Sequence, residues 1–265
     1  MAVLPCGLRR AKLARSAQLT SGNGAMNGAI FRKFWRISAI CWATLEFQSF
    51  MLIITIKQGK EKSLLAGEPW IYASAVEKVD GKPNEKMKLG GTAIVQSSAQ
   101  KFLARAAHNP KSQIRARVWT FDEAEPVDHA LVKRRVKAAL AKSAAAAGKA
   151  RPNQVVKLIN AETDGLPGLI VEQFGGQGGY LICEFQAAGV DAWKVPIVQS
   201  LIAETGCRNV YERADELVRK GEGLAVVSGA LAGDEPPDEV LVDEGAGKRV
   251  STDLKTGFRR THRVV

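Results

Sequence analysis

Apolar residues in the second half of the chain fall into short runs that are separated by turn-forming residues. Two of these runs, at residues 155–159 and 169–171, flank the segment D-G-L-P-G at residues 164–168. The Asp-Gly pair tolerates a positive φ angle, and Pro167 fixes φ without donating a hydrogen bond. The pattern therefore predicts a strand, a sharp turn and a second strand.

The region that begins at Met51 has a similar alternation of apolar runs and turns. A short helix is expected at residues 59–65, and a turn-rich linker at residues 80–85. The expected strands and extended segments are residues 52–56, 68–72, 92–96, 102–106 and 114–119. Short strands at this spacing predict a small β-barrel.

The apolar period changes to that of a helix over residues 127–147. Val132, Val136 and Leu140 recur at helical spacing, and Gly148 is a plausible end. Lys133, Arg134, Arg135 and Lys137 lie toward the other side. This basic face could contact phosphates, although a solvated face of a connecting helix is the simpler interpretation.

The remaining pattern predicts a compact α+β layer with the order β-β-α-β-β. A further strand at residues 180–185 follows the glycine-rich segment 175–179, which we interpret as a hairpin loop. A phosphate-binding loop would need a helix directly after it, and here strands lie on both sides. A helix is expected at residues 190–205, and further strands at residues 209–212, 239–242 and 248–253.

Residues 1–50 differ from the rest of the chain in composition. The chain carries a formal net charge of +11, and this segment holds seven basic residues against the single acidic Glu46. It could be a targeting segment, or upstream sequence before a start at Met51. Residues 51–265 keep a moderate positive charge, which is compatible with RNA binding.

Cysteines and histidines do not form a recognisable chemical site. No C-x-x-C pair occurs, so neither zinc nor a disulfide framework is expected, and the cysteine usage indicates a reducing cytoplasm. Cys183 is expected to be packed and Cys207 to lie in a turn. His108, His129 and His262 are each expected at the surface. The sequence contains no run of about 18 apolar residues, so no membrane span is predicted.

Four separated segments carry a resemblance to a known family. They read K-Q-G-K-E-K-S-L-L-A-G-E-P-W-I-Y from Lys57, N-P-K-S-Q-I-R-A-R-V-W-T-F from Asn109, N-A-E-T-D-G-L-P-G-L-I-V-E from Asn160 and Y-E-R-A-D-E-L-V-R-K-G-E-G-L from Tyr211. In this order they resemble the bacterial large-subunit (23S) ribosomal RNA cytosine-C5 methyltransferases that carry an N-terminal PUA domain, the RlmI-like group.

The resemblance implies a domain organisation for this chain. It implies a PUA-like RNA-binding domain at residues 51–125, a linker helix at 126–149 and the central α+β domain at 150–255. Residues 1–50 would be an extension without a counterpart, and residues 256–265 an aberrant tail. The third part of the family, a Rossmann-type domain that binds S-adenosylmethionine and carries a catalytic cysteine, has no counterpart in this sequence.

The function implied by the resemblance is therefore limited. A class I methyltransferase needs a glycine-bearing turn, an acidic residue for the ribose hydroxyls and a thiolate beside the base, and no segment supplies this set. We expect a chain that binds large-subunit ribosomal RNA, holds no cofactor and does not catalyse alone. The alternatives are a stand-alone RNA-binding or ribosome-associated module, and one half of a methyltransferase whose catalytic half is encoded separately.

Seven residues of the barrel are candidate RNA contacts. Basic side chains bind phosphates, and aromatic rings stack on unpaired bases. The candidates are Lys57, Lys60, Lys62, Trp70, Arg105, Arg115 and Arg117. A solvated surface charge is the simpler interpretation of each basic residue, and a core position is the simpler interpretation of Trp70.

Overall fold

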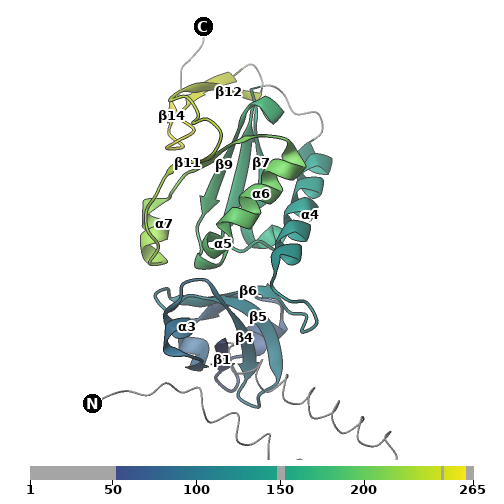
Figure 1. Ribbon diagram of the computed structural model, residues 1–265, viewed down its shortest axis with the longest axis vertical. Coiled ribbons are helices and arrows are strands. Elements are labelled where there is room, and N and C mark those ends of the chain that lie inside the picture. The colour runs from purple at the N-terminus through teal and green to yellow at the C-terminus, as the bar shows by residue number, and fades with distance from the viewer. Residues whose placement is uncertain (1–51, 148–152, 246–247, 261–265) are drawn as a thin grey trace, which may run out of the picture. The chain divides into compact units, whose positions relative to one another are not determined.

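The computed structural model describes residues 52–147, 153–245 and 248–260 (Figure 1). The extension predicted for residues 1–50, the helix end at Gly148 and the surface position of His262 lie outside these residues. The described elements comprise two larger sheets, a smaller one and the helices that accompany them.

The first sheet has six strands in the order β2-β6-β5-β4-β1-β3. They are β1 (Leu52–Ile56), β2 (Trp70–Tyr72), β3 (Val76–Asp80), β4 (Gly91–Ser97), β5 (Phe102–His108) and β6 (Ile114–Thr120). β1 and β4 are parallel, and the other neighbours are antiparallel. Buried aliphatic residues such as Ile54, Val95 and Val118 form its single core. The five strands expected here are confirmed.

The prediction of a turn-rich linker at residues 80–85 was wrong in part. β3 ends at Asp80 and the short helix α3 (Pro83–Met87) covers the second half of the predicted linker, so residues 81 and 82 connect the two elements. Pro83 lies at the start of the helix, where its missing N–H costs nothing. β3 escaped the pattern because it is an edge strand: only Val76 and Val79 pack against the core. The expected short helix is confirmed as α2 (Lys62–Leu65).

The predicted long helix is confirmed as α4 (His129–Ala147). Asp128 begins it, since its Oδ1 accepts a hydrogen bond of 2.8 Å from the backbone N–H of Leu131. Leu131, Val132 and Val136 are buried in the core of the sheet that follows. On the opposite side Lys133, Arg134 and Lys137 are exposed.

The second sheet has five strands in the order β11-β10-β9-β8-β7. They are β7 (Val155–Asn160), β8 (Leu169–Phe174), β9 (Tyr180–Phe185), β10 (Asn209–Glu212) and β11 (Gly229–Ala232). β9 and β10 are parallel, whereas the other pairs are antiparallel. The α+β class and the three strands expected at residues 155–159, 169–171 and 180–185 are confirmed. The order β-β-α-β-β omitted one of the three strands that precede the helices. β11 was missed because it is a short edge strand.

The helix expected at residues 190–205 is two helices, α5 (Ala188–Ala192) and α6 (Lys194–Thr205). Trp193 separates them, with φ −101° and ψ 15°. Pro196 lies in the first turn of α6, where its missing N–H breaks no helical hydrogen bond. α4 and α6 pack against each other beside the sheet (Figure 1). A third helix, α7 (Glu216–Gly221), follows β10.

The turn between β7 and β8 is confirmed. Residues Ala161–Asp164 form a 3₁₀ turn, and Gly165 and Gly168 have φ of +70° and +82°. A Cβ atom at Gly168 would lie 2.4 Å from the Cβ atom of Ala187. This position therefore requires glycine for two reasons, the positive φ and the close approach. The loop at residues 175–179 joins the antiparallel strands β8 and β9, as predicted.

A third, small sheet has the order β12-β13-β14. It consists of β12 (Val240–Gly245), β13 (Lys248–Thr252) and β14 (Arg259–Arg260). The two strands expected in this region are confirmed. The tail was predicted to begin at residue 256, but Ser251 pairs with Arg260 in the ladder. The fold therefore continues at least to Arg260.

Candidate nucleic-acid interface

The edge strand β2 presents two aromatic side chains on the outer face of the barrel. Ile71 points into the core, whereas Trp70 and Tyr72 are 37% and 50% exposed. Trp70 pairs in register with Arg117 of β6. The simpler interpretation of Trp70 as a core residue was therefore wrong, because alternation along this strand turns it outward.

The three lysine candidates lie around the start of α2 and are exposed. Lys57 follows β1 directly, and its Nζ donates a hydrogen bond of 3.0 Å to the carbonyl oxygen of Ser74. Ser74 lies in the 3₁₀ turn Ala73–Ala75, which directly follows β2. This hydrogen bond connects Lys57 to the turn that follows β2, the strand that carries Trp70 and Tyr72.

Arg117 is held by two carboxylates of the second sheet's domain. Its NH1 lies 2.9 Å from Glu162 Oε1, and its NH2 lies 3.0 Å from Glu222 Oε1. Trp70 Nε1 donates to the same Glu162 Oε1 at 3.0 Å. These contacts lie within one compact unit of the chain, and they engage Arg117 internally.

Glu222 is the centre of a buried polar cluster that sequence reasoning missed. Its carboxylate accepts hydrogen bonds from Asn109 Nδ2 at 2.9 Å and from Ser112 Oγ at 3.0 Å, besides the pair with Arg117. Asn109 Nδ2 also donates to the Glu222 carbonyl oxygen. Two of the four segments that carry the family resemblance supply these residues, so the segments meet in space.

Arg105 and Arg115 also make internal contacts. Arg105 NH2 donates to the carbonyl oxygen of Glu123 at 2.9 Å, and Arg115 NH1 donates to that of Pro110. A guanidinium has five N–H donors, so both retain capacity for a phosphate. Of the seven candidates, the structure brings Trp70 and Arg117 together at Glu162.

A hollow of about 680 Å³ opens beside the end of β6. We call it the β6 hollow. Three of the resemblance-bearing segments, α4 and the residue after β6's segment line it: Gly67, Pro69, Val118, Trp119, Thr120, Phe121, Asp122, Arg135, Glu162, Thr163, Gly165 and Pro167. Its size is within the range of ligand-binding sites.

The prediction that His108 lies at the surface was wrong. His108 ends β5, is only 2% exposed, and its Nδ1 has no hydrogen-bond partner among the described residues. Burial, reinforced by the charge of Arg115, lowers the pKa of His108 from 6.5 to about 4. The ring is therefore neutral near pH 7. His129 is exposed, as predicted, and its ring meets that of Trp193 edge-on.

Both described cysteines are free and buried. Cys183 is packed in the core of the second sheet, as predicted, and burial raises its pKa far above the ordinary value. Cys207 follows α6 and its Sγ donates to the carbonyl oxygen of Gly179 at 3.3 Å. Burial raises the pKa of Cys207 as well. Nucleophilic attack requires the thiolate, and the raised pKa values of Cys183 and Cys207 disfavour the thiolate, so neither cysteine has the properties of a nucleophile.

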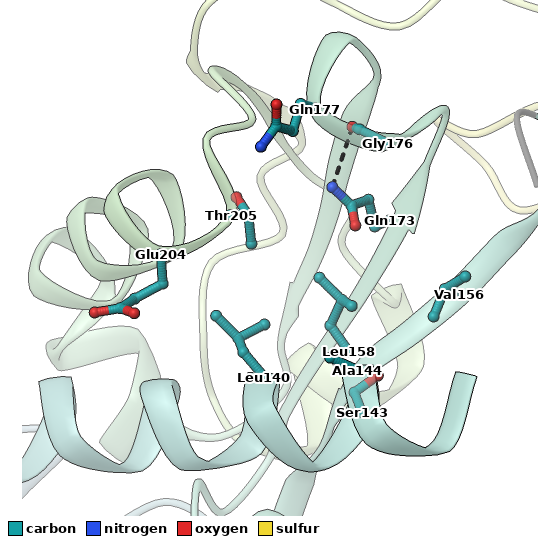
Figure 2. A pocket seen from close by; sticks show the side chains of 10 residues that line it. All are labelled: Leu140, Ser143, Ala144, Val156, Leu158, Gln173, Gly176, Gln177, Glu204 and Thr205. Atoms are coloured by element: carbon teal, nitrogen blue, oxygen red, sulfur yellow. Dashed lines mark hydrogen bonds between the residues drawn. The ribbon is translucent and has the colours of Figure 1, made fainter. Parts of the chain in front are cut away.

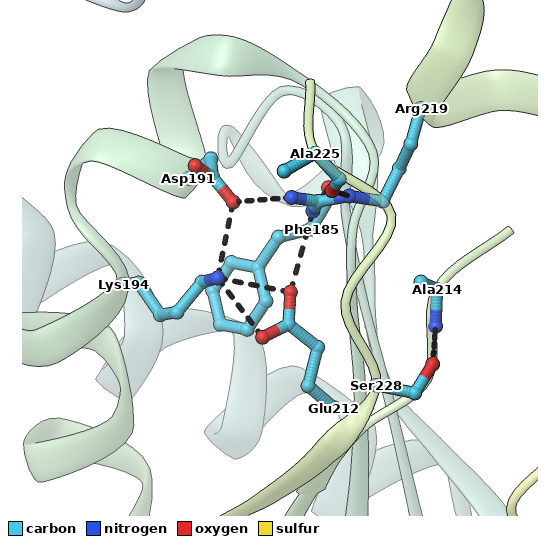
Figure 3. A network of polar contacts seen from close by, with 8 residues as sticks. All are labelled: Phe185, Asp191, Lys194, Glu212, Ala214, Arg219, Ala225 and Ser228. Carbon is cyan, nitrogen blue, oxygen red and sulfur yellow. Dashed lines mark hydrogen bonds and ion pairs between the residues drawn. The ribbon is translucent and has the colours of Figure 1, made fainter. Parts of the chain in front are cut away.

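A charge network joins the end of β10 to the neighbouring helices (Figure 3). Both oxygens of Glu212 lie 2.9 Å from Lys194 Nζ, and Arg219 NH1 lies 3.3 Å from Oε1. Arg219 NH2 and Lys194 each lie 3.1 Å from Asp191. Glu212 and Arg219 are almost fully buried. Every charge in the network has a partner, so no buried charge is left uncompensated.

A pocket of about 290 Å³ lies between α4, the first strands of the second sheet and the end of α6 (Figure 2). Leu140, Val156 and Leu158 form its apolar part. Some of the polar groups around it are engaged: Ser143 Oγ donates to Lys157 O and Thr205 Oγ1 to Leu201 O. Gln177 and Glu204 also line the pocket.

Two further classes of site can be assessed. Within the described ranges, no three His, Cys, Asp or Glu side chains group as metal ligands would. None of the described helices combines the length and the apolar character that crossing a bilayer requires.

These features define a PUA-like domain joined to a mixed-sheet domain. Residues 54–121 match the family described as PUA-like domain. Ribosomal RNA large subunit methyltransferase I from Aliivibrio fischeri is 37% identical over 209 residues, which cover 77% of this chain and 50% of that protein. The protein of the same name from Pseudoalteromonas translucida is 39% identical over 217 residues, with the same coverage.

The chain is thus homologous, over 77% of its length, to the family of the ribosomal RNA large subunit methyltransferase I proteins. It spans about half the length of these curated relatives. A candidate SAM-dependent methyltransferase from Streptococcus mutans has a similar fold, with 16% identity and a TM-score of 0.61 over 79% of this chain and 50% of that one. A candidate methyltransferase solved with SAH matches with 17% identity and a TM-score of 0.62.

Proposed function

We propose that this chain is the RNA-binding part of a ribosomal RNA (cytosine-C5) methyltransferase, and that it binds large-subunit ribosomal RNA through the PUA-like barrel. The observation that carries this proposal is the homology to ribosomal RNA large subunit methyltransferase I, in which the aligned region includes the PUA-like domain. The free cysteines fit a reducing cytoplasm as the place of action.

The outer face of β2 and the start of α2 support RNA binding. Lys60 and Lys62 are exposed. Trp70 and Tyr72, which follow eight and ten residues after Lys62, present partly exposed aromatic rings. Lysines supply the salt-dependent attraction to phosphates, and aromatic rings stack on unpaired bases. Arg117 contributes indirectly, because its two carboxylate partners hold the barrel against the second domain.

We further propose that this chain does not transfer methyl groups by itself. The parallel crossover from β9 through α5 and α6 to β10 is the arrangement in which a nucleotide cofactor could be sought. The residues there do not fit S-adenosylmethionine. A Cβ at Gly189, after β9, would lie 2.6 Å from Ala107 Cβ, and Glu212, at the end of β10, is already paired with Lys194 and Arg219.

Two measurements test the proposal. Filter binding between about 50 and 200 mM salt should show affinity for large-subunit ribosomal RNA that falls steeply with salt. Calorimetric titration with S-adenosylmethionine should show no heat of binding. Micromolar S-adenosylmethionine affinity would contradict the catalytic part, and salt-independent or absent RNA binding would contradict the first part.

A stand-alone RNA-binding module is the second candidate. Both larger sheets enclose cores of their own, which favours a chain that folds and acts without a partner. The split-enzyme alternative requires a separate catalytic half. Methyl transfer to ribosomal RNA on adding the methyltransferase domain of a relative in trans would favour the split enzyme, and its absence would favour the stand-alone module.

A further inference from the structure

The β6 hollow has the composition of a site for a flat, polar ring. We infer that it binds one unstacked, amino-bearing nucleobase of single-stranded RNA. This inference rests on the proposed RNA-binding function and names a subsite for it. The hollow lies where the barrel meets the turn between β7 and β8, and ligand sites occur preferentially at such domain junctions.

An aromatic ring and two prolines supply apolar walls. Phe121, directly after β6, lines the hollow and remains 43% exposed, so part of its ring is accessible to a ligand. Pro69 and Pro167 line the same space. Each base has a π-face that stacks on an aromatic side chain, so Phe121 is the stacking surface of the subsite.

Carboxylate oxygens supply the hydrogen-bond acceptors. Glu162 lines the hollow, and the hydrogen bonds that it accepts from Trp70 Nε1 and Arg117 NH1 both fall on Oε1. Its side chain keeps 22% of its surface exposed. A carboxylate accepts from the exocyclic amino group of cytosine, adenine or guanine, and uracil has no such group.

Charge argues against a phosphate as the occupant. The cation in the wall, Arg135, is engaged: NH1 donates to the carbonyl oxygen of Gly165 at 2.6 Å, and NH2 pairs with Glu125 at 3.2 Å. Asp122 and Glu162 bring negative charge to the same space. An anion would be repelled there, whereas a neutral base with an amino group would be accepted.

Fluorescence anisotropy with labelled oligo(C) and oligo(U) tests the subsite in the full chain. Wild type should bind oligo(C) more tightly than oligo(U). Phe121→Ala should weaken oligo(C) binding between about 5-fold and 150-fold, and Phe121→Trp should retain it. The matched control is Phe258→Ala, which removes an exposed ring that does not line the hollow and should leave binding unchanged.

The outcomes separate the subsite from the proposed function. If wild type binds ribosomal RNA but Phe121→Ala and Phe258→Ala behave alike, the subsite is overturned and RNA binding stands. Equal affinity of wild type for oligo(C) and oligo(U) overturns the amino-group preference. If wild type binds neither ribosomal RNA nor oligonucleotide, the proposed function itself fails. Circular dichroism of Phe121→Ala confirms that any loss is not a loss of folding.

Discussion

The guanidinium of Arg117 and the carboxylate of Glu222 lie 3.0 Å apart, although 105 positions separate them in the chain. Arg117 belongs to the barrel and Glu222 follows α7 of the second domain. Asn109 and Ser112 donate to the same carboxylate. These four residues therefore form a polar joint between the two domains. From the sequence, Arg117 was an RNA-binding candidate and the other three had no assigned role.

Glu222→Ala should be strongly destabilising. The substitution leaves the buried Asn109 and Ser112 and the half-buried Arg117 without their common acceptor, and removing one partner of a buried ion pair costs about 3–5 kcal/mol. Urea unfolding measures the change. The control is Glu216→Ala, whose pair with Lys220 is exposed and should contribute at most about 1 kcal/mol. Similar losses for the two variants would contradict the joint.

Gly168→Ala should cost more stability than Gly59→Ala. Both glycines have φ of +82°, so both substitutions carry the left-handed backbone penalty of about 1–2 kcal/mol. Gly59 has open space around it, whereas a Cβ at Gly168 would meet Ala187 at 2.4 Å. Thermal unfolding of the two variants isolates the clash, since the backbone term cancels. An equal fall in Tm would mean that the turn yields freely.

The pair Lys60→Ala and Lys62→Ala should weaken RNA binding without affecting stability. Each lysine that contacts a phosphate contributes about one unit to the dependence of log affinity on log salt, so the double variant should lower this slope by about two units. Filter binding across a salt series measures it. Lys220→Ala, on α7, is the matched control for loss of an exposed positive charge. An unchanged slope in the double variant would remove these lysines from the interface.

His108 should make the protein less stable in mild acid. Its pKa is lowered from 6.5 to about 4 by burial, so the unfolded chain binds the proton more readily. The stability contribution is complete above pH 6.5 and is lost as the pH falls from 6.5 toward 4, by an amount on the order of 3 kcal/mol. Urea unfolding at pH 7 and pH 5 should show this loss in wild type.

The variant His108→Leu isolates the contribution of that ring. It retains the titrating carboxylates of wild type, so the difference between the two proteins belongs to His108. The stability of His108→Leu should fall less between pH 7 and pH 5. Parallel pH dependence of wild type and variant would show that His108 is protonated at no cost in the folded protein.

Much of the local structure could be predicted from the order of residues. Apolar periods located most strands and α4, and the sequence D-G-L-P-G predicted a turn that the backbone angles of Gly165 and Gly168 confirm. The edge strands β3 and β11 were missed because they bury too few apolar residues to leave a period. The single helix expected at residues 190–205 is divided at Trp193, three residues before Pro196, whose ring and missing N–H disfavour a helix that continues from the preceding turn.

By itself the sequence determined the α+β class, the turns and the resemblance to a ribosomal RNA methyltransferase family, since these depend on neighbouring residues. Tertiary structure alone decided which polar residues meet. Trp70, Arg117 and Glu162 lie far apart in sequence, and only the packing of barrel and second domain brings them together. Burial likewise made His108 neutral, because desolvation depends on the whole fold and not on the residues beside it.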